Sequence, residues 1–218
     1  MQAIAETLFD AAYLSFVIFI GAYILRKGTT NIHRMVGWMA VLLGCGDAFH
    51  LIPRCYALWT TGLEANAAAL GIGKLITSVT MTVFYFLLYK VWKENFQVPH
   101  CYKRDGVMWG LVVFRIVLCL LPQNQWLSYH QPLLMGILRN IPFAILGGLL
   151  VWMFIQQEKR TGKHAFHWMP LVIILSFGFY LPVVLWSSQF PMIGILMISK
   201  TLAYVWVVVM GYQLVKTT

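Results

Sequence analysis

Residues 168–186 read WMPLVIILSFGFYLPVVLW, a run of 19 residues without a charged side chain. A helix needs about 20 mostly apolar residues to cross the hydrocarbon core of a bilayer, so this run predicts a transmembrane helix. The basic residues Lys159, Arg160 and Lys163 stand shortly before it. Lys and Arg collect on the cytoplasmic side of membrane proteins, which predicts that this helix begins in the cytoplasm and runs outward.

Six further stretches have the same apolar character. All seven together predict one domain, residues 1–218, with spans at about 8–25, 35–53, 67–89, 106–121, 132–155, 168–186 and 192–215. The chain is 60% hydrophobic and 11% charged, whereas a soluble domain has about twice that charged fraction. We therefore predict an all-α integral membrane bundle of seven transmembrane helices, a multi-pass protein of the plasma membrane.

The segments between the predicted spans alternate in charge. Eleven of the 16 Lys and Arg residues fall on one side of the predicted membrane: Arg26, Lys27, Arg34, Lys90, Lys93, Lys103, Arg104, Lys159, Arg160, Lys163 and Lys216. The positive-inside rule then places the amino terminus outside and the carboxy terminus in the cytoplasm. These basic segments are expected to meet anionic membrane lipid rather than nucleic acid.

Ionisable residues inside the predicted spans are the main functional signal. A charge near the centre of a bilayer costs a few kcal/mol, so such residues usually face the interior of the bundle and find partners there. Asp47, His50 and Arg54 follow helical spacing, which puts them on one face of the second helix. The other candidates for a shared binding site are Lys74, Arg115, Arg139, Asn140, Lys200 and Tyr204. The predicted orientation places nearly all of them toward the outer leaflet.

Positive charge exceeds negative charge among these residues. Asp47 can neutralise one or two cations, and an excess of cations in a cavity attracts an anionic partner. Arginine suits bidentate contacts with carboxylates or phosphates. The sequence therefore predicts an outer-half cationic cavity that binds or transports an anionic or zwitterionic small molecule or a lipid headgroup. For single residues a structural role stays open, either pairing with Asp47 or reaching up to lipid phosphates.

Two other function classes also fit these residues. A membrane-embedded enzyme that modifies lipid would use Asp47 and His50 as its acid–base pair. A structural or assembly subunit would have its buried charges paired off, with no cavity between the helices. The sequence alone does not decide whether the protein is an enzyme.

No metal or cofactor is predicted from the sequence. Asp47 and His50 provide two ligands, whereas a hydrolytic zinc site needs three protein ligands and a water. The seven-helix zinc hydrolases of the alkaline-ceramidase and adiponectin-receptor superfamily need an H-x-x-x-H pair in their last helix, and the span 192–215 contains no His. His164 and His167 are interpreted as interfacial residues.

Lys200 in the seventh span resembles the retinal lysine of microbial rhodopsins, which share the predicted topology. Residues 180–186, YLPVVLW, also resemble the aromatic–proline segment of their sixth helix. The resemblance implies a retinal-type pigment attached to Lys200, as a minor alternative. The sequence departs from that family in its third span, which carries Lys74 and no carboxylate counter-ion. Asp47 is the candidate counter-ion.

Overall fold

The computed structural model describes residues 2–187 and 189–216, and within those ranges it contains helices and no strand. The α-helices are α1 (Gln2–Lys27), α2 (Asn31–Trp59), α3 (Ala67–Asn95), α4 (Tyr102–Leu120), α5 (Leu133–Thr161), α6 (Met169–Trp186) and α7 (Leu196–Lys216). Two short 3-10 helices, η1 (Pro122–Asn124) and η2 (Pro191–Ile195), precede α5 and α7. The prediction of an all-α chain is confirmed.

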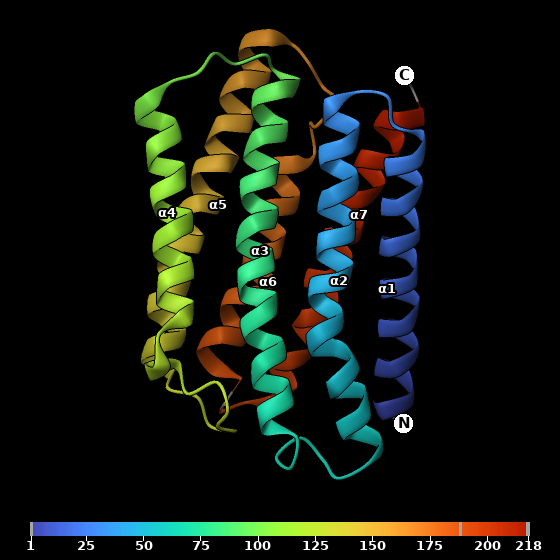
Figure 1. Cartoon of the computed structure of the whole chain (residues 1–218), viewed down its shortest axis with the longest axis vertical. Coiled ribbons are helices and arrows are strands. Elements are labelled where there is room, and N and C mark those ends of the chain that lie inside the picture. The colour runs from blue at the N-terminus through green and yellow to red at the C-terminus, as the bar shows by residue number, and fades with distance from the viewer. Residues whose placement is uncertain (1, 188, 217–218) are drawn as a thin grey trace.

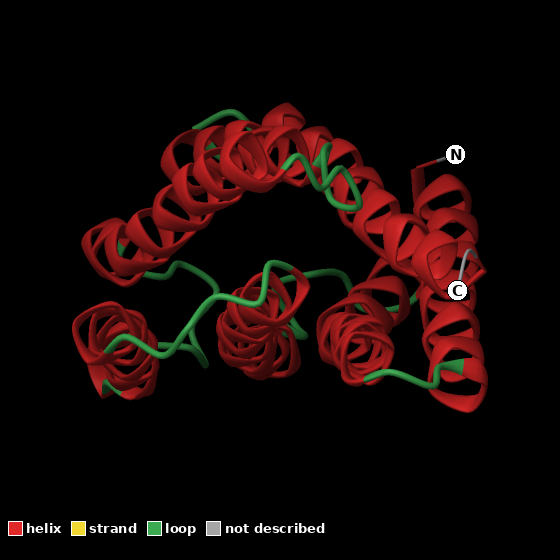
Figure 2. Ribbon diagram, turned by 90° about the horizontal axis from the view of Figure 1, so that it is seen from above, coloured by secondary structure: helices red, strands yellow, loops and turns green. Residues whose placement is uncertain are grey.

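The helices form a closed ring in sequence order. Each helix packs against the next one along the chain, and α1 packs against α7. Contacts of α2 with α7 and of α3 with α5 cross the ring. Helices α1 to α4 lie in front of α5, α6 and α7 in Figure 1, and the view along the helix axes in Figure 2 shows two layers. Helix α1 begins at one end of the bundle, and α7 finishes at the other end (Figure 1).

The outer surface of the bundle is strongly apolar. Phe19 is 70% exposed and Trp152 is 60% exposed, and large hydrophobic side chains are exposed on all seven helices. Exposed apolar surface of this extent is typical of proteins that contact a membrane. It supports lipid as the surrounding solvent.

Six of the seven α-helices are long and apolar enough to cross a bilayer, namely α1, α2, α3, α5, α6 and α7. Helix α4 differs because its 19 residues include Lys103, Arg104, Asp105 and Arg115. Three of these charged residues stand at the start of α4, before the predicted span 106–121. The fourth, Arg115, lies in the middle of the helix and is buried.

The helices extend beyond several of the predicted spans. Pro53, the expected end of the second span, lies inside α2, which continues to Trp59. In lipid, a proline inside a helix is tolerated where neighbouring groups satisfy the freed carbonyl. Helix α2 therefore has 29 residues, or about 43 Å at 1.5 Å per residue, which exceeds the thickness of the hydrocarbon core.

Local signals explain several helix ends. The Thr30 side chain accepts a hydrogen bond of 3.2 Å from the backbone N–H of His33, which caps the start of α2. Helix α5 is followed by Gly162 at φ +67°, a left-handed conformation that glycine adopts without a steric penalty. Pro170 lies in the first turn of α6, where its missing N–H costs nothing.

Two glycines allow α3 to approach its neighbours closely. A Cβ at Gly73 would overlap the backbone carbonyl oxygen of Phe49 on α2, and a Cβ at Gly71 would overlap the carbonyl oxygen of Trp126. Helices in lipid pack through small residues because backbones can then come together. These contacts fix the position of α3 against α2 and against the segment that connects α4 to α5.

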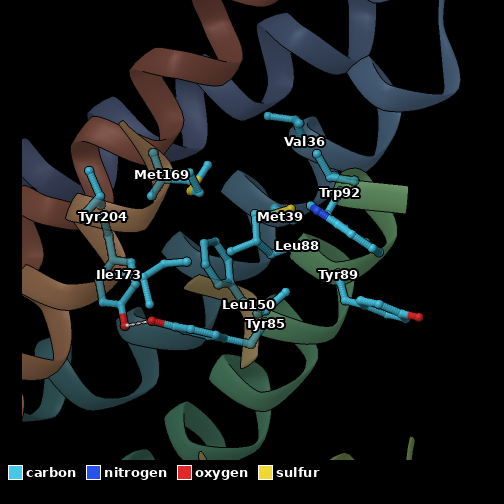
Figure 3. Close-up of a cluster of buried hydrophobic side chains, with 14 of the residues drawn as sticks. Val36, Met39, Tyr85, Leu88, Tyr89, Trp92, Leu150, Met169, Ile173 and Tyr204 are labelled. Carbon is cyan, nitrogen blue, oxygen red and sulfur yellow. Dashed lines mark hydrogen bonds between the residues drawn. The ribbon is translucent and has the colours of Figure 1, made fainter. Parts of the chain in front are cut away.

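The half of the bundle where α2 begins and α3 finishes has a packed apolar core. Figure 3 shows Met39, Leu88, Leu150 and Met169 converging there from four helices. A void lined in part by Met39, Leu88 and Met169 has a volume of about 10 Å³, which is room for one water at most. The predicted site residues of α2, α3, α5 and α7 lie toward the other half of the bundle.

Candidate functional site

The predicted site residues come from five helices around the ring. Helix α2 contributes Asp47, His50 and Arg54, α3 contributes Lys74, α4 contributes Arg115, α5 contributes Arg139 and Asn140, and α7 contributes Lys200 and Tyr204. His50 interacts electrostatically with Lys74, Arg54 and Lys200. Lys200 in turn interacts with Asp47 and Arg115. The helices thus bring most of this set within electrostatic range of one another.

Arg54 is paired within the protein. Its Nε donates a hydrogen bond of 3.0 Å to Oε2 of Glu6 on α1. Nearby, the indole N–H of Trp59 donates to the Thr7 hydroxyl at 2.9 Å, which ties the same two helices together. Arg54 therefore stabilises the contact between α1 and α2, and its charge is neutralised by Glu6.

Asp47 interacts with a residue that the sequence analysis did not single out. The buried Tyr13 hydroxyl donates a hydrogen bond of 2.7 Å to Oδ2 of Asp47. Within the described part of the chain, no hydrogen bond joins Asp47 to His50, and the Nδ1 atom of His50 is buried without a hydrogen-bond partner. The acid–base pair expected for the lipid-modifying enzyme is not assembled as a hydrogen-bonded unit.

Lys200 is surrounded by aromatic rings. Its Nζ lies 4.5 Å from the centre of the Tyr180 ring and 5.5 Å from the centre of the Tyr204 ring. Asp47 attracts it, although the two form no direct ion pair among the described residues. The Tyr204 hydroxyl lies 3.5 Å from that of Tyr85 (Figure 3). Lys200 is therefore held mainly by cation–π contacts.

Arg115 is the most buried cation of the site, with 2% of its surface exposed. Its guanidinium carbon lies 3.3 Å from the centre of the Phe143 ring. Its Nε and Nη1 atoms are buried and have no hydrogen-bond partner among the described residues. The groups with the strongest electrostatic effect on it are hydroxyls and a thiol, from Tyr85, Tyr180, Tyr204 and Cys119, rather than a carboxylate.

Arg139 is bound by neutral groups. Its Nη1 donates a hydrogen bond of 2.8 Å to Oδ1 of Asn124, which is fully buried, and its guanidinium stacks 4.3 Å from the centre of the Trp126 ring. The neighbouring Asn140 accepts a hydrogen bond of 3.2 Å from the Tyr180 hydroxyl. These contacts position Arg139 without neutralising its charge.

Lys74 has an exposed side chain and lies near two other cations. Arg139 and Arg54 both repel its charge. No ion pair involves Lys74 in residues 2–187 and 189–216. It is therefore a cation whose surroundings favour an added anion.

Sequence reasoning missed Tyr13, Tyr180, Asn124 and Trp126 as partners of the site. The signal for Tyr13 and Tyr180 was their location inside predicted spans, because a tyrosine hydroxyl buried there needs a hydrogen-bond or cation–π partner. Asn124 and Trp126 lie in the segment between two spans, where the hydropathy pattern gives no information on contacts.

A hollow of about 380 Å³ lies elsewhere, between the end of α3 and the start of α4. It is bordered by the ion pair of Lys93 and Asp105, whose atoms are 2.9 Å apart. None of the described residues that line this hollow, or the small apolar void, belongs to the predicted site. The predicted residues form a group of interacting cations rather than the wall of either space.

The six long apolar helices and the apolar outer surface define this chain as a multi-pass helical membrane protein. The chain matches no model of a protein family, and neither the curated proteins nor the solved structures contain a match.

Proposed function

We propose that this protein is a seven-span plasma-membrane protein with its amino terminus outside, and that it binds an anionic or zwitterionic ligand between its helices as a receptor or carrier. The ligand is a small molecule or a lipid headgroup that carries a carboxylate or phosphate. Its binding residues are Arg115, Lys200, Lys74, Arg139, Asn140, Tyr204, His50 and Asp47.

The main support for the proposal is Arg115, a buried cation with unsatisfied hydrogen-bond donors. Burying a charge without an opposite charge beside it costs several kcal/mol, so proteins rarely do it without a reason. Arg115 is buried, stacks on Phe143 and has two nitrogens without hydrogen bonds in the described structure. An oxyanion would provide the missing acceptors in the bidentate geometry that a guanidinium favours.

The balance of charge supports the same proposal. Arg54 is neutralised by Glu6 and leaves the set of available cations. The remaining cations are Lys74, Arg115, Arg139 and Lys200. Asp47 is the carboxylate that attracts Lys200. A bound anion would reduce the repulsion among these cations.

The seven-span topology is supported by helix length and loop charge. Helix α4 has 19 residues, or about 28 Å, close to the roughly 30 Å of a hydrocarbon core. Its flanking charges Lys103, Arg104 and Asp105 lie at the end where the other basic connections lie, which the positive-inside rule assigns to the cytoplasm.

Ligand-dependent thermal unfolding of the purified protein in detergent tests this function. The probes are phosphate, glutamate, betaine and a short-chain phosphatidic acid, each compared with sodium chloride at equal ionic strength. At least one probe is expected to raise the unfolding temperature in a saturable way, because a ligand that binds the folded state stabilises it.

Matched variants separate the proposed site from general ion effects. Arg115→Gln and Lys200→Gln are expected to abolish the shift, whereas Arg34→Gln, which removes an exposed charge in the first turn of α2, is expected to retain it. The proposal is overturned if no probe shifts the wild type, or if all three variants respond as the wild type does.

A further inference from the structure

Glu158, His164 and His167 gather where α5 finishes and α6 begins, away from the proposed ligand site. The Nδ1 atoms of His164 and His167 lie 2.7 Å and 2.6 Å from the same Glu158 oxygen, Oε1. One ligand atom from each of the three residues lies within 4.8 Å of the others. We propose that this Glu158–His164–His167 cluster binds a divalent transition-metal ion of the Zn²⁺ type.

The local backbone explains why the three side chains converge. Gly162 reverses the chain after α5, and the backbone N–H of His167 donates a hydrogen bond of 3.1 Å to the carbonyl oxygen of His164. The two imidazoles therefore project from one turn, with ring centres 5.8 Å apart. Glu158 projects toward them from the last turns of α5, so a rigid helix supplies the carboxylate.

The donor set suits a borderline metal ion. Imidazole nitrogens favour zinc and its first-row neighbours, and a carboxylate completes a two-histidine, one-carboxylate set. With the proton of each neutral imidazole on Nε2, both Nδ1 atoms offer a lone pair to the metal. Water fills the remaining coordination positions, because both histidines are exposed to solvent.

Only small movements are needed to fit the ion. Tetrahedral ligands at about 2.1 Å from zinc are about 3.4 Å apart, so each histidine nitrogen would move less than about 1 Å from Oε1. The exposed His164 and His167 side chains have room for this adjustment.

The positive charges near the cluster do not prevent a cation from binding there. The Nζ of Lys163 donates a hydrogen bond of 3.0 Å to the backbone carbonyl oxygen of Asn95. Lys159 and Arg160 are exposed on the helix, where solvent and salt screen their charges. We expect them to weaken the affinity of the site without abolishing it.

Titration with Co²⁺, a spectroscopic substitute for Zn²⁺, tests the proposal. The full-length protein is purified in detergent without a polyhistidine tag and stripped with EDTA. Visible absorption is expected to report one Co²⁺ per chain, displaced by one equivalent of Zn²⁺. The affinity of His164→Ala/His167→Ala is expected to fall at least tenfold.

Two further variants make the result specific. Glu158→Gln keeps a hydrogen-bond acceptor for both imidazoles but is a poor metal ligand, so its affinity is also expected to fall at least tenfold. His100→Ala removes an exposed histidine that pairs with Asp105 at the same end of the bundle, and it is expected to bind as the wild type does. Wild-type affinity in the double variant, or no saturable binding by the wild type, overturns the proposal.

Discussion

The Arg115→Met variant tests whether Arg115 is placed to bind a ligand or to stabilise the fold. Methionine retains an unbranched side chain that can pack on Phe143, but it removes the charge and the donors. If no anion is bound, we expect Arg115→Met to make the protein more stable. Functional sites often reduce stability in this way, since groups placed for a ligand are unsatisfied without it.

The size of the effect follows from the contacts of Arg115. Its two buried nitrogens without partners, Nε and Nη1, cost about 1–3 kcal/mol each. The stacking on Phe143 offsets up to about 2 kcal/mol of this cost. The free energy of unfolding is therefore expected to rise by roughly 2 kcal/mol, and the unfolding temperature by about 4–8 °C for a chain of this size.

Thermal unfolding by near-UV circular dichroism, in detergent and in Tris chloride buffer without phosphate or carboxylates, measures this change. Arg139→Met is the matched control. It leaves Oδ1 of the buried Asn124 without its Arg139 donor and should therefore lower stability by about 1–3 kcal/mol. Equal destabilisation by both variants would show that Arg115 is already satisfied inside the protein, and the argument for an anionic ligand would fail.

Three other measurements test the fold and the topology. Gly73→Ala should lower the unfolding temperature, because overpacking against backbone costs about 1–3 kcal/mol. Gly148 has open space around it, so Gly148→Ala should be neutral or slightly stabilising. A larger loss of stability in Gly148→Ala than in Gly73→Ala would contradict the close contact between α2 and α3. A double-mutant cycle of Glu6→Gln and Arg54→Gln should give a coupling of about 1 kcal/mol, and a coupling of zero would remove this link between α1 and α2. A variant with Cys101 as its sole cysteine should react with an impermeant maleimide only after the cells are permeabilised; labelling of intact cells would refute the proposed orientation.

The positions of the helices could be predicted from the sequence, whereas their exact ends could not. Long apolar runs between basic segments identified the helices because lipid requires such runs. Pro53 was a misleading signal for the end of α2, since a proline in a membrane-embedded helix does not have to terminate it. The span expected at 106–121 matches most of α4, but the helix begins earlier, at Tyr102, and so includes Lys103, Arg104 and Asp105.

The partners of the charged residues were beyond the reach of sequence patterns. Helical spacing placed Asp47 and Arg54 on one face of α2, but nothing in that spacing identified Tyr13 or Glu6 on α1 as their partners. Those contacts depend on the register between two helices, which close packing determines. The sequence therefore overestimated the free positive charge by including Arg54.

The histidines that precede α6 illustrate a similar limit. Their spacing was visible in the sequence, and an interfacial role was the expected interpretation. Glu158 precedes them across the turn at Gly162, and the left-handed conformation of that residue brings the carboxylate back to the imidazoles. A three-dimensional turn, rather than a sequence motif, creates the cluster.

The closed ring of helices constrains how the chain can be rearranged. Helices α1 and α7 are neighbours, yet α1 begins at the opposite end of the bundle from the end of α7 (Figure 1). A short peptide could not join the start of α1 to the end of α7 in a circular permutant. The linker would have to cover about 30 Å, or roughly 20 helical residues, and in a bilayer it would have to be an additional membrane-spanning helix.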